Sequence, residues 1–118
     1  MTKNEYIYNA KILNVVDGDT VDVELDLGFY VFAKERMRLN GLDTPEMNSM
    51  EPSVRKLAKD AKEFVATFTG HLVTIKSYKQ DKYGRFLADI YLVGDVESIN
   101  AKLLANGMAK PYSGGARV

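Results

Sequence analysis

Two short acidic segments of the chain could supply oxygen ligands for a metal ion. Asp17-Gly18-Asp19-Thr20 falls between two expected strands, and Asp43-Thr44-Pro45-Glu46 directly follows another. Taken alone, each segment is typical of an ordinary turn. Together they suit a hard cation such as Ca²⁺ or Mg²⁺, because two aspartates in one site repel each other unless a cation neutralises them. The absence of cysteine and the scarcity of histidine argue against zinc.

Two arginines accompany these carboxylates. Arg38 lies shortly before Asp43, and Arg85 closes the polar segment Asp81-Lys82-Tyr83-Gly84-Arg85. The planar guanidinium of arginine pairs with two phosphate oxygens at once. The simpler alternative for either arginine is an ion pair at or near the surface. If the fold brings all these residues together, they form a divided site for a metal ion and a phosphate.

The hydrophobic pattern predicts the elements that must position these residues. Alternating or β-branched apolar residues indicate strands over about 6–16, 21–26, 33–42, 72–78 and 86–92. Apolar residues with a 3.6-residue period predict a helix over about 54–68, ended by Gly70. A last short helix is expected over about 98–106, with Gly107 just past its end.

This order predicts an α+β fold that is mainly β. Five strands with a helix between the third and the fourth suit a Greek-key barrel of the OB type, followed by a short C-terminal helix. We expect residues 1–118 to form a single domain. Phe29, Tyr30 and Phe32 lie on an elongated hairpin, where barrel packing or a protein contact is favoured over a stacking platform for nucleic acid.

Composition limits the function in a different way. Sixteen basic residues balance sixteen acidic ones, so the bulk charge does not indicate a nucleic-acid binder and local clustering must supply any such property. The N-terminus has no signal-peptide pattern, and no apolar run approaches the roughly 20 residues of a membrane span. We expect a protein that is cytoplasmic by default, or secreted if a signal has been removed, with no membrane contact. We expect a monomer and leave a dimer open.

Three motifs in one order resemble the signature blocks of the staphylococcal nuclease (thermonuclease) family. The resemblance covers the chain from about residue 11 to 112 and includes the five-residue step from Arg38 to Asp43. Residues 100–110 resemble the closing helix of the family and its Gly-x-Ala ending. Tyr112 aligns approximately with the tyrosines that pack on the substrate base, which implies a possible base contact.

The resemblance implies a calcium site. Asp19, Asp43 and the main-chain carbonyl of Thr44 match the calcium ligands of the family. Asp17 and Asp81 match neighbouring acidic positions that support the site. Calcium itself is implied by the resemblance alone, because the ligand chemistry also permits Mg²⁺ or Mn²⁺.

The resemblance also implies the groups that act on the substrate. Arg38 and Arg85 match the two arginines that grip the scissile phosphate. Glu46 matches the glutamate assigned as general base or water-orienting group. Lys82 and Tyr83 match residues near the terminal phosphate of a bound nucleotide.

These roles imply a calcium-dependent nuclease that hydrolyses phosphodiester bonds of DNA and RNA. By the habit of the family it would prefer single-stranded or flexible regions and leave 3′-phosphate ends. The alternative is a catalytically inactive OB-type module that binds nucleic acid or protein. A third reading is an interaction protein that uses the aromatic hairpin and no nucleotide.

Overall fold

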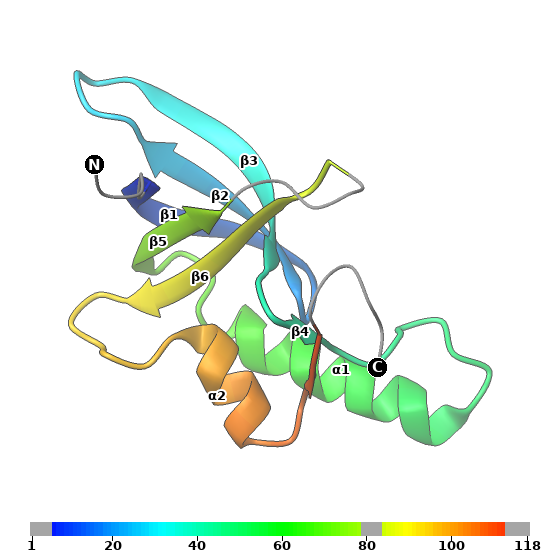
Figure 1. The fold of residues 1–118 in the computed structure, drawn as a ribbon. Coiled ribbons are helices and arrows are strands. Elements are labelled where there is room, and N and C mark those ends of the chain that lie inside the picture. The colour runs from blue at the N-terminus through cyan, green and yellow to red at the C-terminus, as the bar shows by residue number, and fades with distance from the viewer. Residues whose placement is uncertain (1–5, 79–83, 113–118) are drawn as a thin grey trace.

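Seven strands and two helices make up the computed structural model, which describes residues 6–78 and 84–112 (Figure 1). Five of the strands form a closed barrel: β1 (Tyr6–Asp17), β2 (Thr20–Asp26), β3 (Phe32–Leu39), β5 (Leu72–Tyr78) and β6 (Phe86–Leu92). Their order around the barrel is β1-β2-β3-β6-β5, with every pairing antiparallel except that of β3 with β6. The expected OB-type barrel is confirmed.

The core lies inside this barrel because apolar and polar residues alternate along its strands. On β2, Val21, Val23 and Leu25 are buried, while the intervening Asp22 and Glu24 face outward. The largest fully buried side chains come from the strands and from both helices: Ile12, Val21, Val23, Leu39, Leu42, Val65, Val73, Ile75, Ile90, Ile99 and Leu103.

The third strand ends earlier than expected, and this difference shapes the end of the barrel where β4 lies. We expected a strand over 33–42, but β3 stops at Leu39 and the chain turns at Gly41, where φ is +82°. Such a φ suits glycine and interrupts a regular strand. The chain then forms the two-residue β4 (Leu42–Asp43), which pairs with β7 (Lys110–Pro111), a strand that the sequence pattern did not predict.

Helix α1 (Pro52–Ala66) begins two residues before the expected start and ends two residues before the expected end. Proline suits the first helical position because its ring fixes φ near the helical value, and its missing N–H would have no partner within the helix there. Ala58, Ala61 and Val65 form its buried stripe, and Phe64 and Phe68 pack edge to face at the margin of the core. Gly70 was expected to end the helix, but the C-cap is Thr67 and Gly70 closes the turn that follows, with φ at +83°.

The second helix, α2 (Ile99–Ala105), is joined to the barrel by a buried amide. Ser98 caps its N-terminus, its Oγ accepting a hydrogen bond from the Ala101 N–H at 3.0 Å. The Asn100 side chain accepts from the Ile90 N–H and donates to the carbonyl oxygens of Asn40 and Ala88. This amide therefore links α2, β6 and the turn after β3.

The hairpin between β2 and β3 extends past the barrel, at the end of the molecule away from α1 (Figure 1). Phe29 and Tyr30 at its tip are 95% and 97% exposed, so barrel packing is wrong for these two residues. Both have left-handed backbones, with φ of 56° and 61°. That conformation costs a non-glycine residue about 1–2 kcal/mol. Neither helix of the described ranges is long and apolar enough to cross a membrane.

Candidate active site

A cleft of about 1060 Å³ lies at the end of the barrel that carries β4 and β7. Its walls come from the β1–β2 turn, the end of β3, the segment from β4 into the first turns of α1, Arg85 before β6, and the segment around β7. Every described residue that the sequence analysis placed in the site lines it: Asp17, Asp19, Arg38, Asp43, Thr44, Glu46, Arg85 and Tyr112. The three remaining candidates lie outside the described residues: Asp81, Lys82 and Tyr83.

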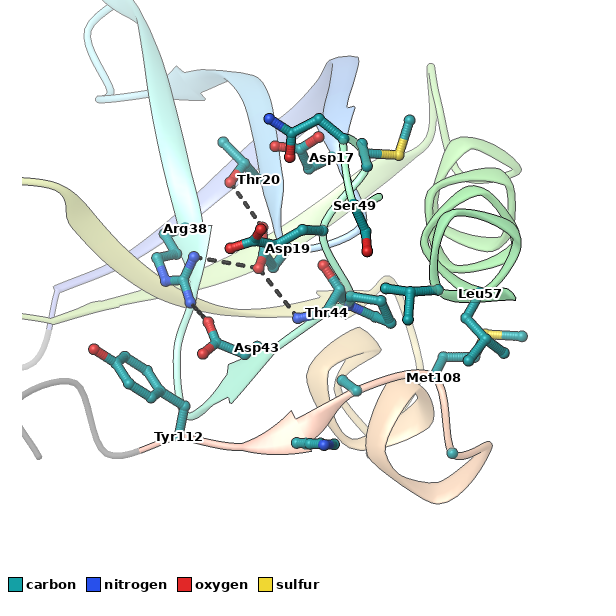
Figure 2. A pocket seen from close by; sticks show the side chains of 18 of the residues that line it. Asp17, Asp19, Thr20, Arg38, Asp43, Thr44, Ser49, Leu57, Met108 and Tyr112 are labelled. Carbon is teal, nitrogen blue, oxygen red and sulfur yellow. Dashed lines mark hydrogen bonds and ion pairs between the residues drawn. The ribbon is translucent and has the colours of Figure 1, made fainter. Parts of the chain in front are cut away.

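Arg38 is the centre of the polar half of this cleft. It is 9% exposed, and its Nη1 donates to Asp19 Oδ2 at 3.2 Å. Its Nη2 donates to the Leu42 carbonyl at 3.1 Å and forms an ion pair with Asp43 Oδ1. Figure 2 shows the guanidinium pointing at both carboxylates. One buried positive charge faces two carboxylates and offsets their negative charge in part, so each of the three groups depends on the others.

Asp19 fastens three segments of chain together. It is 7% exposed, and its Oδ2 also accepts from the Thr44 N–H at 3.2 Å. Its Oδ1 accepts from the Thr20 hydroxyl at 3.1 Å, and its main-chain carbonyl accepts from the Leu39 N–H at 2.8 Å. The β1–β2 turn, the end of β3 and the segment after β4 are thus held at one point.

Strand register explains why these residues meet. The antiparallel ladder of β2 with β3 places Thr20 opposite Arg38, so the turn residue Asp19 reaches the end of β3. Gly18 lets α1 approach the same turn. A Cβ at Gly18 would lie 2.9 Å from Ala61 Cβ and 3.0 Å from Thr44 Cγ2, closer than such atoms normally pack.

Glu46 and Arg85 both line the cleft. Both are exposed, Glu46 in the segment between β4 and α1 and Arg85 just before β6. The parallel pairing of β3 with β6 joins Arg38 to Leu87, which places both arginines at the same end of the barrel. The cleft can therefore present two guanidinium groups and a solvent-accessible carboxylate to one ligand.

Tyr112 reaches the cleft through the short β4–β7 ladder. Its N–H donates to the Gly41 carbonyl at 2.9 Å, directly after the pairing of Leu42 with Pro111. The guanidinium carbon of Arg38 lies 5.6 Å from the centroid of its ring, a cation–π distance. Tyr112 thus contacts Arg38, a relation that the sequence analysis did not foresee.

A family model described as staphylococcal nuclease homologue matches residues 36–116. The chain belongs to the staphylococcal nuclease family. The matched range begins within β3 and includes Arg38, Asp43, Glu46 and Arg85. Asp19 lies before the matched range, and its contact with Arg38 links the β1–β2 turn to the residues within that range.

Curated relatives agree with this membership. The thermonuclease of Staphylococcus hyicus is 34% identical over 110 residues, which cover 91% of this chain and 60% of the relative. The thermonuclease of Staphylococcus intermedius is 36% identical over 102 residues, with 84% and 56% covered. Endonuclease YncB of Bacillus subtilis is 32% identical over 108 residues, with 88% and 48% covered. The chain therefore spans between about half and three fifths of the length of these nucleases.

The resemblance to this family implied a metal site, so the oxygen ligands available in the cleft are relevant. The described residues contain no group of three or more histidine, cysteine or acidic side chains suited to a metal. Asp19 and Asp43 nevertheless converge on one cationic group, and both offer hard oxygen atoms. Two carboxylates and a carbonyl fit a hard cation whose shell is completed by water and substrate phosphate, as is usual for Mg²⁺.

Several cleft residues escaped the sequence analysis of this staphylococcal nuclease homologue. Thr20 was seen only as part of a turn, although its hydroxyl orients Asp19. Leu57 was assigned to the apolar stripe of α1, yet it lines the cleft and is 54% exposed. Met47 and Met108 carried no signal at all, because a methionine in a loop has no periodicity to interpret.

Proposed function

We propose that this chain is a metal-dependent phosphodiesterase that cleaves DNA and RNA. The observation that carries the proposal is the meeting of Asp19, Arg38, Asp43, Glu46 and Arg85 in one open cleft. Two arginines beside acidic groups suit a phosphodiester, which is anionic and gains further negative charge as water attacks it. The thermonucleases and the endonuclease among the relatives support the same reaction class.

Arg38 and Arg85 would bind the phosphate in different ways, because Arg38 is buried and Arg85 is exposed. Three acceptors hold Arg38, so its orientation is set before substrate arrives and its remaining N–H groups can bind a phosphate oxygen. Arg85 is exposed and lines the same cleft, so its guanidinium can reach a phosphate bound there. Preorganised donors of this kind are worth about 3–4 kcal/mol each where charge develops in the transition state.

Glu46 would accept or orient a proton of the attacking water. Its side chain is exposed and borders the cleft, so water can reach it. A carboxylate positioned within hydrogen-bond reach of the water contributes as a general base. As the oxygen of water bonds to phosphorus, Glu46 would take the proton of that water; the bond from phosphorus to the 5′ oxygen breaks, and this oxygen takes a proton from solvent to leave as a 5′-hydroxyl.

A hard cation would be held by Asp19, Asp43 and the carbonyl of Thr44. When bound, it would polarise a phosphate oxygen and lower the pKa of a bound water. Calcium is the ion we propose, with Mg²⁺ and Mn²⁺ as the chemical alternatives. Asp17 lines the same cleft and adds to its negative field.

The proposed substrate is single-stranded or flexible nucleic acid cut to 3′-phosphate ends. A site that holds phosphate and reads no base edge accepts DNA and RNA alike. Lys82 and Tyr83, which lie outside the described residues, would contact a terminal phosphate.

The test is cleavage of denatured DNA and of RNA with calcium, with magnesium and with EDTA. The proposal predicts calcium-dependent cleavage that EDTA abolishes, and 3′-phosphate ends that a 3′-phosphatase removes. Metal-independent binding without any cleavage would instead identify the chain as an OB-type binding module. Loss of both binding and cleavage would overturn both readings.

A further inference from the structure

The two ends of the cleft differ in chemistry. Its ionic end holds Asp19, Arg38, Asp43 and Arg85. Its lining also includes four apolar side chains, here called the apolar wall: Met47, Val54, Leu57 and Met108. Figure 2 shows Leu57 and Met108 on the side of Thr44 away from Arg38 and Tyr112. A phosphate needs the ionic end only, so the apolar wall has no task in the reaction proposed above.

Leu57 lies at the edge of the buried stripe of α1. It is four residues before the buried Ala61, yet it is 54% exposed, whereas Ala58, Ala61 and Val65 face the barrel. Val54 is four residues before Ala58 and continues the same stripe toward the start of α1, where it is half-buried and lines the cleft. The two side chains therefore border the cleft, and Leu57 leaves much of its apolar surface open to a ligand.

The remaining wall residues come from separate segments. Met47 lies between β4 and α1 and is 38% exposed, and Met108 precedes β7 and is half-buried against the core. Methionine is unbranched and adapts its shape to varied flat or irregular ligands. Three chain segments thus place apolar atoms beside a phosphate-sized ionic site.

We propose that the apolar wall is a subsite for the base of the nucleotide next to the scissile phosphate, on the side away from Tyr112. The inference rests on the proposed function and names which part of the substrate the cleft grips besides phosphate. Contacts with the face of a base are sequence-tolerant, since every base has an apolar face. The subsite would bind purines and pyrimidines without selecting a sequence.

The experiment uses oligonucleotides with one natural phosphodiester flanked by methylphosphonate linkages. Each has a base, or an abasic tetrahydrofuran residue, on the 5′ or the 3′ side of that bond. For the unmodified protein, kcat/KM should fall roughly tenfold with the abasic residue on one of the two sides, a loss within the range of a single base contact. With Leu57→Ala, kcat/KM on the substrate that carries both bases should fall by a similar factor. The abasic residue on the sensitive side should then lower kcat/KM little further. Met47→Ala, in a loop, is the second variant.

Leu104→Ala is the matched control, because Leu104 is a partly exposed leucine of α2 that is not among the residues lining the cleft. For Leu104→Ala, the ratio of kcat/KM on the base-containing substrate to kcat/KM on the abasic substrate should equal that of the unmodified protein. Binding of the same oligonucleotides in EDTA, measured by fluorescence anisotropy, separates the two proposals. Base-dependent binding that Leu57→Ala removes, without cleavage in any metal, would overturn hydrolysis and leave the subsite standing. An unchanged ratio in Leu57→Ala and Met47→Ala, in both binding and cleavage, would overturn the subsite.

Discussion

The guanidinium carbon of Arg38 lies 5.6 Å from the centroid of the Tyr112 ring, while the same guanidinium binds Asp19 and Asp43. The central arginine of the cleft is therefore oriented both by charge and by an aromatic ring. The ring reaches it only because β7 pairs with β4. This relation changes what is expected of Tyr112, from a base contact alone to a residue that positions Arg38.

Replacing Tyr112 tests that role. Tyr112→Phe keeps the ring over Arg38 and should retain most of the activity, whereas Tyr112→Ala should lower kcat on DNA roughly tenfold or less, since one cation–π contact is worth about 0.5–2 kcal/mol. The loss should persist on both abasic substrates described above. If the loss in Tyr112→Ala falls on KM and disappears with an abasic substrate, Tyr112 acts as a base contact instead.

Arg85→Ala should remove activity without harming the fold. Arg85 is exposed, so its loss should leave the melting temperature nearly unchanged, while kcat should fall by roughly 10²–10³ as for other preorganised charge-stabilising donors. Arg36→Ala is the control: Arg36 is also exposed, but it pairs with Asp22 on the outside of the barrel. Near-normal cleavage by Arg85→Ala would exclude this residue from the chemistry.

Gly18→Ala should destabilise the protein through the contact of the β1–β2 turn with α1. The new methyl group would lie 2.9 Å from Ala61 Cβ, and overpacking of this kind costs about 1–3 kcal/mol in the free energy of unfolding. Urea denaturation would measure the loss. In a double-mutant cycle, Ala61→Gly should offset part of this loss of stability, because it removes the Ala61 methyl group that the new Cβ would clash with. Additive effects of the two substitutions would show that the contact does not limit the packing.

The pH dependence of stability should include the pair of Asp95 and Lys102. A hydrogen bond from Lys102, at 2.7 Å, lowers the pKa of the Asp95 carboxyl and raises the pKa of Lys102. The lowered pKa means that the contribution of Asp95 is complete above its unfolded pKa of about 3.9 and is lost as the pH falls through the folded pKa. The raised pKa of Lys102 means that its contribution is lost only above about pH 10.4.

Asp95→Asn should thus be less stable than the unmodified protein at pH 7, by a small amount because both groups are near the surface. The difference in free energy of unfolding should shrink as the pH falls below about 4. Urea denaturation at pH 7 and pH 3 measures it. An equal difference at both pH values would mean that the substitution acts through something other than this ion pair.

The tip of the β2–β3 hairpin adds a prediction about strain. Tyr30 has a φ of 61°, which glycine adopts without a steric penalty. Tyr30→Gly should therefore leave the free energy of unfolding unchanged or raise it by up to about 1 kcal/mol, although glycine also gains freedom in the unfolded chain. Circular dichroism melting would measure it, and a loss of more than about 1 kcal/mol would show that the left-handed backbone at Tyr30 is not a source of strain.

The sequence alone predicted the five barrel strands, the two helices and several of the residues that line the cleft. Alternation along 20–26 and the helical period after Pro52 predicted β2 and α1, because a side-chain pattern that repeats locally shows which face will be buried. The three motifs carried the resemblance to the family. Asp17, Asp19, Arg38, Asp43, Thr44, Glu46, Arg85 and Tyr112 were all placed in one site before the cleft was known, and they all line it.

Only the tertiary structure decided how those residues contact one another. The pairing of β4 with β7 joins residues nearly 70 positions apart, and two-residue strands have too little pattern to predict. It carries Tyr112 to Arg38, while the close approach of α1 turns Leu57 toward the cleft and excludes any side chain at Gly18. Local sequence sets which residue types are available, and distances between segments remote in the chain are set by packing, which no single segment encodes.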